Sequence, residues 1–252
     1  MLMMFRIMRI MALMAYCMVI YAKAVPFGPA RRREAINRLF PEWGRYLLRT
    51  FKVKLNVFGR ENLPPHDGRP RVFLCNHQSQ IDIPAMTAAT NMGVGFVAKK
   101  ELGRIPILAF WMRAVGCVFI DRSDKHGARK ALENAALTLD SRPLVVFPEG
   151  TRSKTGKRLP IKLGGIRMAL LAGARVIPVH IHNSRAAYEA YDPNGEFPVP
   201  VTLRFFPPME THDLVDEKAS WNQIKEYLEA CWAKADVEVE KNAIAKEKSK
   251  SV

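Results

Sequence analysis

The chain has 252 residues, enough for one large α/β domain with added segments, and its 48% hydrophobic and 25% charged residues exclude a largely disordered protein. The formal net charge of +15 indicates an anionic partner such as a membrane, a nucleic acid or a phosphorylated substrate. Four scattered cysteines without a C-x-x-C pair, beside only six histidines, argue against a disulfide framework or a zinc site and fit reduced cytosolic thiols.

The first predicted element is an uncharged apolar helix over residues 10–22, preceded by Arg6 and Arg9 and followed by Lys23. Counted from Met1, the segment is just long enough to cross a bilayer, and it would also suit a helix lying at the bilayer surface. A cleaved signal sequence is the alternative, although no convincing small-x-small site leads into a cysteine-paired domain. We therefore predict a membrane anchor or an interfacial helix.

A turn around residues 26–29 ends this helix, and residues 31–52 follow with apolar side chains at three- and four-residue steps. This pattern predicts a basic amphipathic helix, or two short helices divided at Pro41. Residues 1–60 hold twelve Lys and Arg residues against two Glu, which is +10 of the net +15. The helix could simply pack on its own domain, but this charge favours contact with an anionic lipid surface.

From residue 53 onward, short apolar strands alternate with helices, which predicts a mostly parallel sheet flanked by helices. The predicted strands are residues 53–57, 71–75, 94–98, 117–120, 143–147 and 175–181, with an edge strand expected at 201–205. The predicted helices are residues 82–91, 106–115, 128–139, 165–172 and a last one from 216 onward. The chain thus divides into N-terminal membrane-associated helices (1–52), the main domain (53–239) and a charged tail (240–252) that is expected to fray.

One histidine and one carboxylate, His77 and Asp82, stand between the strand at 71–75 and the helix at 82–91. Residues five apart do not share a helix face, so the chain must turn tightly if these side chains are to meet. Asp82 could then accept the Nδ1 proton of His77 and leave Nε2 as a base. A helix-capping aspartate beside a turn histidine without any chemistry explains the spacing equally well.

Charged residues also follow the other predicted strands, at the sheet edge where open α/β folds bind ligands. They are Lys99 and Lys100, Asp121 and Arg122, and Glu149-Gly150-Thr151-Arg152. Singly, each cation is more simply a solvated surface charge. Together, cations beside a histidine base suit transfer chemistry on the hydroxyl group of a phosphorylated molecule. The sequence has no Gly-x-Ser-x-Gly elbow for a serine nucleophile and no glycine pattern for ATP or NAD.

Four blocks over residues 72–181 resemble, in order, those of the glycerolipid acyltransferases, the family that contains the lysophosphatidic acid acyltransferases. They are Asn76-His77-(x4)-Asp82, the stretch from Lys99 to Arg122, Phe147-Pro148-Glu149-Gly150-Thr151-Arg152-Ser153, and Val176-Ile177-Pro178-Val179. The resemblance implies transfer of a fatty acyl group from acyl-CoA or acyl-acyl carrier protein to 1-acyl-glycerol-3-phosphate, giving phosphatidic acid. It implies no metal and no bound cofactor.

The resemblance also implies roles for single residues. His77 would be the general base and Asp82 its orienting partner, so that the hydroxyl attacks the thioester directly. The phosphate would be held by Arg152, with Lys100, Arg122 and the turn of Glu149, Gly150 and Thr151 around it, and Lys100 is preferred to Lys99 as the inward cation. The implied partners are membrane lipids, lysophosphatidic acid and the acyl donor, and the implied location is the inner or cytoplasmic membrane with a cytoplasmic active site.

Other functions stay open at this stage. The acceptor could be another lysophospholipid or a lyso-aminolipid, because residues 154–165 and the region after Asn183 match nothing diagnostic. The chain could also be a lipid-surface binding module without activity. Nucleic-acid binding is the weakest alternative, because the positive charge accompanies apolar helices rather than exposed aromatic strands.

Overall fold

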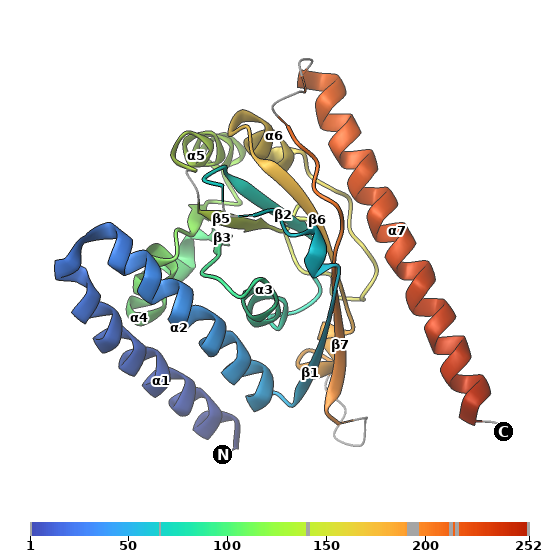
Figure 1. The fold of residues 1–252 in the computed structure, drawn as a ribbon, viewed down its shortest axis with the longest axis horizontal. Coiled ribbons are helices and arrows are strands. Elements are labelled where there is room, and N and C mark those ends of the chain that lie inside the picture. The colour runs from blue at the N-terminus through green and yellow to red at the C-terminus, as the bar shows by residue number, and fades with distance from the viewer. Residues whose placement is uncertain are drawn as a thin grey trace.

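The computed structural model describes residues 2–65, 67–139, 142–190, 197–211, 214 and 217–250. At its centre is a seven-stranded sheet in the order β1-β7-β6-β2-β5-β3-β4 (Figure 1). The strands are β1 Val53–Phe58, β2 Arg71–Cys75, β3 Gly95–Lys99, β4 Val118–Ile120, β5 Pro143–Val146, β6 Arg175–His182 and β7 Val199–Phe205. All neighbouring strands are parallel except β6 and β7, which are antiparallel, so the predicted mostly parallel sheet is confirmed.

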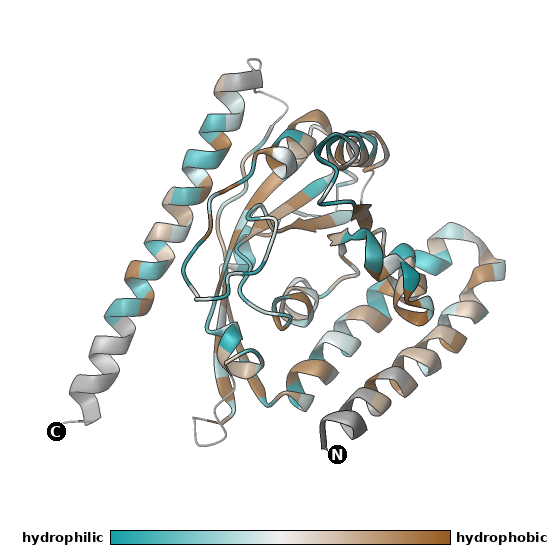
Figure 2. Cartoon of the chain, turned by 180° about the vertical axis from the view of Figure 1, so that it is seen from behind, coloured by the Kyte–Doolittle hydropathy of each residue, from teal (hydrophilic) through white to brown (hydrophobic). Residues whose placement is uncertain are grey.

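Helices cover both faces of this sheet. They are α1 Leu2–Ala24, α2 Gly28–Thr50, α3 Asp82–Thr90, α4 Pro106–Ala114, α5 Lys125–Thr138, α6 Gly164–Leu171 and α7 Glu217–Lys250, with short 3-10 helices η1 Val25–Phe27, η2 Arg60–Asn62, η3 Lys100–Arg104 and η4 Ser184–Ala187. Strand β2 shows the two-sided burial, since Phe73 packs with α2 and α3 whereas Leu74 packs with α5, α6 and α7. Figure 2 shows hydrophobic residues along the strands and much of α1, and hydrophilic residues on α5.

The expectation of an edge strand at residues 201–205 is wrong. Strand β7 lies inside the sheet, between β1 and β6, and β1 forms the edge. Its side chains alternate between buried and half-buried, and Val201 and Leu203 are fully buried. This alternation reflects the two faces of the strand and does not reveal its lateral neighbours, and the outer neighbour, β1, comes from a distant part of the chain.

The two N-terminal helices form a hairpin (Figure 1). η1 joins α1 to α2, Gly28 has a φ of +88°, and the Arg32 guanidinium donates to the carbonyl of Val25. Pro41 lies within α2 without dividing it, so one long helix forms rather than two. By length and hydropathy, Ala12–Thr50 is the one candidate membrane span among the described residues, a test that an N-terminal signal sequence would also pass.

Two helix boundaries differ from the sequence-based expectation. Helix α5 begins at Lys125, three residues early, because the Asp124 side chain caps it by accepting from the backbone N of Gly127. The backbone of α7 stays helical to Lys250, where the sequence predicts fraying, because Lys and Glu are good helix formers. The predicted start of that helix at residue 216 lies outside the described residues.

Candidate active site

The turn between β2 and α3 brings His77 and Asp82 together, as their spacing requires. Nδ1 of His77 lies 2.8 Å from Oδ2 of Asp82, and the same oxygen accepts from the backbone N of Gln78 at 2.7 Å and of Ser79 at 2.9 Å. Asp82 is fully buried at the first turn of α3, while His77 keeps 9% of its surface exposed. Because Oδ2 accepts two backbone N–H groups, it is also the acceptor toward the His77 ring. Nδ1 of His77 therefore donates the N–H of this third hydrogen bond.

Residues after β5 hold the histidine from its other side. The rings of His77 and Phe147 stack with centroids 3.9 Å apart, and the backbone N of Ser153 donates to the His77 carbonyl. Asn76 ties the same turn to β6, since its side chain donates to the carbonyl of Ile181 and accepts from its backbone N. The imidazole plane and the turn are therefore fixed by packing and by backbone hydrogen bonds.

Glu149 and Gly150 hold the turn beside His77 in place, and neither lines the cavity, so their place around a phosphate stays a prediction. One oxygen of Glu149 accepts from the backbone N of His77 at 2.8 Å and the other from that of Leu159 at 2.7 Å. Burial raises the pKa of Glu149, and these two N–H groups act in the opposite direction. Gly150 has a φ of +73° and donates its N–H to the Phe147 carbonyl, so it shapes the turn.

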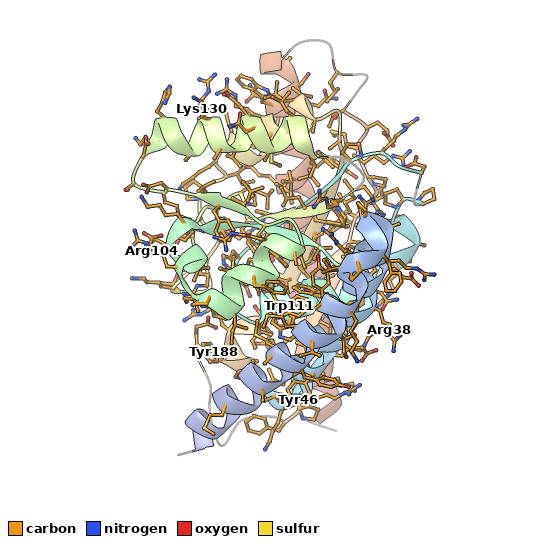
Figure 3. All side chains as sticks on the ribbon, turned by 90° about the vertical axis from the view of Figure 1, so that its left-hand side faces the viewer. Arg38, Tyr46, Arg104, Trp111, Lys130 and Tyr188 are labelled. Atoms are coloured by element: carbon orange, nitrogen blue, oxygen red, sulfur yellow. The ribbon has the colours of Figure 1, made fainter. Side chains whose placement is uncertain are left out.

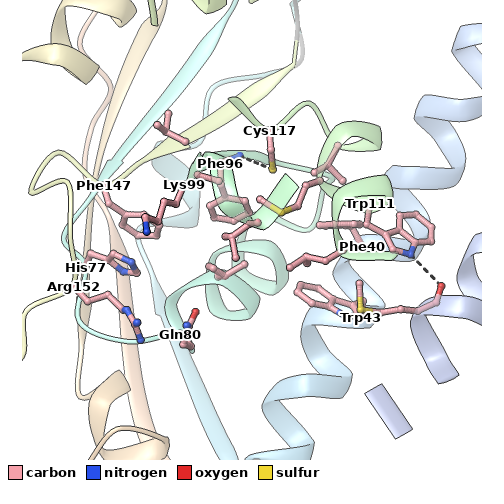
Figure 4. A pocket seen from close by; sticks show the side chains of 18 of the residues that line it. Phe40, Trp43, His77, Gln80, Phe96, Lys99, Trp111, Cys117, Phe147 and Arg152 are labelled. Carbon is pink, nitrogen blue, oxygen red and sulfur yellow. Dashed lines mark hydrogen bonds between the residues drawn. The ribbon is translucent and has the colours of Figure 1, made fainter. Parts of the chain in front are cut away.

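A cavity of about 450 Å³ opens beside His77 (Figure 4). Its polar end is lined by His77, Gln80, Lys99, Arg122, Thr151 and Arg152. The rest is apolar and is built from α1, α2, β3 and α4, with Phe40, Trp43, Phe96 and Trp111 among the larger side chains. The Trp111 indole N–H donates to the Met14 carbonyl and joins α4 to α1, and Figure 3, which faces the helical hairpin, labels Trp111 there. The N-terminal helices thus form part of the cavity wall.

Among the cations predicted at the strand ends, the structure places Lys99, Arg122 and Arg152 on the cavity. Lys100, the cation preferred from the sequence, is not in its lining, so the cavity favours Lys99. The Lys100 ammonium group pairs with Asp121 and lowers the pKa of that carboxyl well below its usual range. The reason lies in the backbone, since Lys99 is the last residue of β3 whereas Lys100 begins η3.

Arg122 and Arg152 both line the polar end of the cavity. Desolvation lowers the pKa of Arg122, and the positive charge of Arg152 lowers it further, against the opposing effect of Glu101. Two like charges held near one another beside a histidine are the arrangement expected of an anion site. Thr151 lines the same end of the cavity, so it stays among the residues predicted to surround a phosphate.

Sequence reasoning missed one acidic residue of the site, Glu189. Its carboxylate accepts from Nη1 of Arg152 at 2.9 Å, from the backbone N of Gln80 at 2.9 Å, and from the hydroxyl of Ser79. Glu189 lies 37 residues from Arg152 and 109 from Gln80 along the chain. No local pattern points to it, because it follows η4 in a segment without a recognisable motif.

Among the described residues, the site offers neither a reactive cysteine nor a group of metal ligands. Burial raises the pKa of the Cys75 thiol, which lies directly before the turn, well above its usual value, so it is not a thiolate nucleophile. Within the described ranges, no three His, Cys, Asp or Glu side chains are grouped so that they could hold a metal ion. The polar end of the cavity combines the imidazole of His77 with nearby guanidinium groups.

Comparison with known proteins agrees with this arrangement. An acyltransferase family model matches residues 54–182, just over half of the chain. The 1-acyl-sn-glycerol-3-phosphate acyltransferase of Cocos nucifera is 31% identical over 183 residues, covering 69% of this chain and 56% of that protein. The 1-acyl-sn-glycerol-3-phosphate acyltransferase alpha of Mus musculus is 30% identical over 202 residues, covering 77% of this chain and 68% of that protein.

A solved structure matches nearly the whole fold. The crystal structure of the 1-acyl-sn-glycerophosphate (LPA) acyltransferase PlsC from Thermotoga maritima has a TM-score of 0.67 and 25% identity, and the match covers 92% of this chain and 98% of that one. The first plant relatives are matched over only 56% and 61% of their own length. The family model and the mouse relative together show that the chain belongs to the acyltransferase family.

Proposed function

We propose that the chain transfers a fatty acyl group to the free hydroxyl of 1-acyl-sn-glycerol-3-phosphate, giving phosphatidic acid, with His77 as the general base. The observation that carries the proposal is the His77–Asp82 pair at the polar end of a cavity that Arg122 and Arg152 also line. The names of the relatives support the same reaction and acceptor.

The chemistry follows from the hydrogen bond at Nδ1. Since Nδ1 carries a proton that Asp82 accepts in a hydrogen bond, Nε2 of His77 is free to accept the proton of the acceptor hydroxyl. The hydroxyl oxygen then attacks the thioester carbonyl of the donor, the carbon–sulfur bond breaks, and the proton on Nε2 passes to the leaving thiolate. Asp82 stabilises the imidazolium that forms in between. No acyl-enzyme is needed.

The polar end of the cavity suits a phosphate, and the apolar part suits a fatty acyl chain. The guanidinium groups of Arg122 and Arg152 would hold the phosphate, and Arg152 is suited to bidentate contact. The apolar length behind them would take a fatty acyl chain, and about 450 Å³ lies within the usual size of ligand sites. The thioester would come from acyl-CoA or from acyl-acyl carrier protein.

The N-terminal helices support action at a membrane, where acceptor and product reside. Helix α1 exposes apolar side chains such as Tyr16 and Val19, and α2 carries a row of arginines. We place the active site on the cytoplasmic face of the inner or cytoplasmic membrane, because acyl-CoA and acyl carrier protein are cytoplasmic.

The test is transfer of a labelled acyl group from acyl-CoA and from acyl carrier protein to a panel of lysophospholipids. The wild-type protein is expected to prefer 1-acyl-sn-glycerol-3-phosphate. His77→Ala should lose at least about 100-fold in kcat with an unchanged melting temperature, because the base alone contributes that much. His126→Ala, on the exposed face of α5, is the matched control and should keep full activity.

Three results would contradict all or part of the proposal. Substantial turnover by His77→Ala would remove His77 as the base. Liposome binding by the wild-type protein without transfer to any acceptor would identify a lipid-surface binding module, and preference for another lysophospholipid would change the acceptor while keeping the chemistry.

A further inference from the structure

Arg152, to which the proposed function assigns the acceptor phosphate, is already paired with a carboxylate. Its Nη1 donates to Oε1 of Glu189 at 2.9 Å, and the two side chains are 41% and 22% exposed. Figure 4 shows Arg152 beside His77 and Gln80 at the polar end of the cavity. A phosphate that binds Arg152 would therefore meet a negative charge next to it.

Glu189 is held in place by more than this ion pair. The backbone N of Gln80 donates to Oε1 at 2.9 Å, and the hydroxyl of Ser79 donates to Oε2. Both donors belong to the turn that carries His77. When Arg152 turns toward another anion, the carboxylate keeps these two contacts and stays beside the site.

Glu189 is the negative charge that lies against the cations of the site. Lys99, Arg122 and Arg152 line the cavity as cations, while Glu101 pairs with Lys99 and Asp121 pairs with Lys100. Of the described carboxylates, Glu189 is the one whose ion pair is with Arg152. A partly solvated pair of this kind is weak enough to be exchanged for a phosphate, which offers more oxygens to the guanidinium group.

We propose that Glu189 is an internal counter-ion of Arg152 which the acceptor phosphate displaces, so that Glu189 sets the affinity of the site for phosphorylated acceptors. The inference rests on the proposed function, since it takes Arg152 as the phosphate ligand. Glu189 lies seven residues beyond the last residue that the family model matches, residue 182. It acts through Arg152 and is a specificity-determining residue rather than a catalytic one.

The direction in which one substitution changes the acceptor KM distinguishes this role from a merely structural one. Glu189→Gln keeps the shape and an acceptor oxygen for the backbone N of Gln80 but removes the charge. It should lower the acceptor KM about fivefold and leave the donor KM unchanged, because the competing charge is gone. If Glu189 only stabilised the turn, the same change would raise the acceptor KM or lower kcat.

A binding measurement tests the same point without turnover. The dissociation constant of glycerol 3-phosphate should fall about fivefold in Glu189→Gln, and the gain should vanish when Arg152→Gln is combined with it. Glu189→Asp keeps the charge and should stay near the wild-type value. Because no acyl transfer is needed, this result remains decisive even where the proposed reaction fails.

Glu238→Gln is the matched control. Glu238 on α7 pairs with Arg204 of β7 at 2.6 Å, with side chains 35% and 32% exposed, and neither lines the cavity. It should change neither KM nor glycerol 3-phosphate binding. The proposal is overturned when Glu189→Gln leaves glycerol 3-phosphate binding unchanged or weaker, or when its gain persists without Arg152.

Discussion

Asp82 concentrates its hydrogen bonds on a single oxygen. Oδ2 accepts from the His77 ring and from two backbone N–H groups, whereas Oδ1 is buried without a partner among the described residues. A carboxylate held at the start of α3 also benefits from the positive end of the helix dipole. The imidazole is thereby fixed in orientation and in tautomer, which is the orienting role that the proposed reaction gives to Asp82.

Asp82→Asn should therefore damage catalysis more than folding. The amide has nearly the same shape, and its oxygen can still accept from the two backbone N–H groups and from Nδ1, but it carries no charge to stabilise the imidazolium that forms when Nε2 takes the hydroxyl proton. We expect kcat to fall by at least about 100-fold in the acyl transfer assay. Asp124→Asn is the control, because asparagine caps a helix as well as aspartate does, and wild-type turnover by Asp82→Asn would contradict the orienting role.

Part of this site can be predicted from the sequence, because short apolar runs show roughly where strands end. His77, Arg122 and Arg152 each lie a few residues after an apolar run, and parallel strands bring such positions to one edge. The choice between Lys99 and Lys100 depends on where β3 ends, which an apolar pattern does not fix to one residue. Glu189 depends on a long-range contact that no local pattern encodes.

At the scale of elements, α2 packs closely against α3 near the site. A Cβ added to Gly44 of α2 would lie 2.8 Å from the carbonyl oxygen of Pro84 and 3.2 Å from the backbone N of Ala88. The same interface includes a hydrogen bond from Arg45 to Asn91. Since α3 begins with Asp82, the position of α2 helps to determine the position of Asp82 and of the His77 ring that it contacts.

Gly44→Ala should destabilise the protein although alanine is the better helix former. The clash is with backbone atoms that cannot move aside, so we expect a loss of about 1–3 kcal/mol in the free energy of unfolding, more than the ~1 kcal/mol that helix propensity returns. Denaturant unfolding measures it. Gly164→Ala is the control, because its Cβ would meet only a flexible Leu132 methyl group at 3.1 Å, and equal stability of both variants would refute the close contact.

The elements themselves are largely predictable, while their contacts are not. Periodicity places α4 and α6 to within a residue or two, and the apolar stripe of α7 is buried as expected, with Trp232 donating to the Val179 carbonyl. The need for glycine at position 44 is invisible in the sequence, because it arises from the neighbouring helix. Pro41 likewise suggests a break that packing against α3 and α1 does not permit.

At the scale of the whole molecule, positive charge gathers where α1 meets α2. A groove of about 400 Å³ between the two helices is lined by Lys23, Arg31 and Arg38 together with apolar side chains that include the exposed Phe27. Cations beside exposed apolar groups suit the interface of an anionic bilayer. This surface lies on the same helices that form part of the cavity wall, so the groove and the cavity would face the bilayer together.

Arg31→Gln combined with Arg38→Gln should weaken binding to vesicles that contain anionic phospholipid. Each cation near such a surface contributes about 1 kcal/mol, so the pair should cost roughly 30-fold in affinity, and added salt should shrink the difference. The control is Arg129→Gln with Lys130→Gln on α5, where Arg129 pairs with Glu133 as Arg31 does with Glu34. Figure 3 shows Arg38 and Lys130 far apart. An equal loss in both double variants would mean that only net charge matters.

The pairing of β1 with β7 has a consequence for how the chain is made. Among the described strands β1 pairs with β7 alone, and Val53 lies opposite Val199, 146 residues later. At ordinary rates of synthesis, β1 leaves the ribosome about 7–30 s before its partner exists. Throughout that interval the hairpin of α1 and α2 can reach a bilayer while the strand after it has an open edge. Insertion would therefore precede closure of the sheet, and a chain released before β7 would expose an unpaired strand that is prone to aggregate.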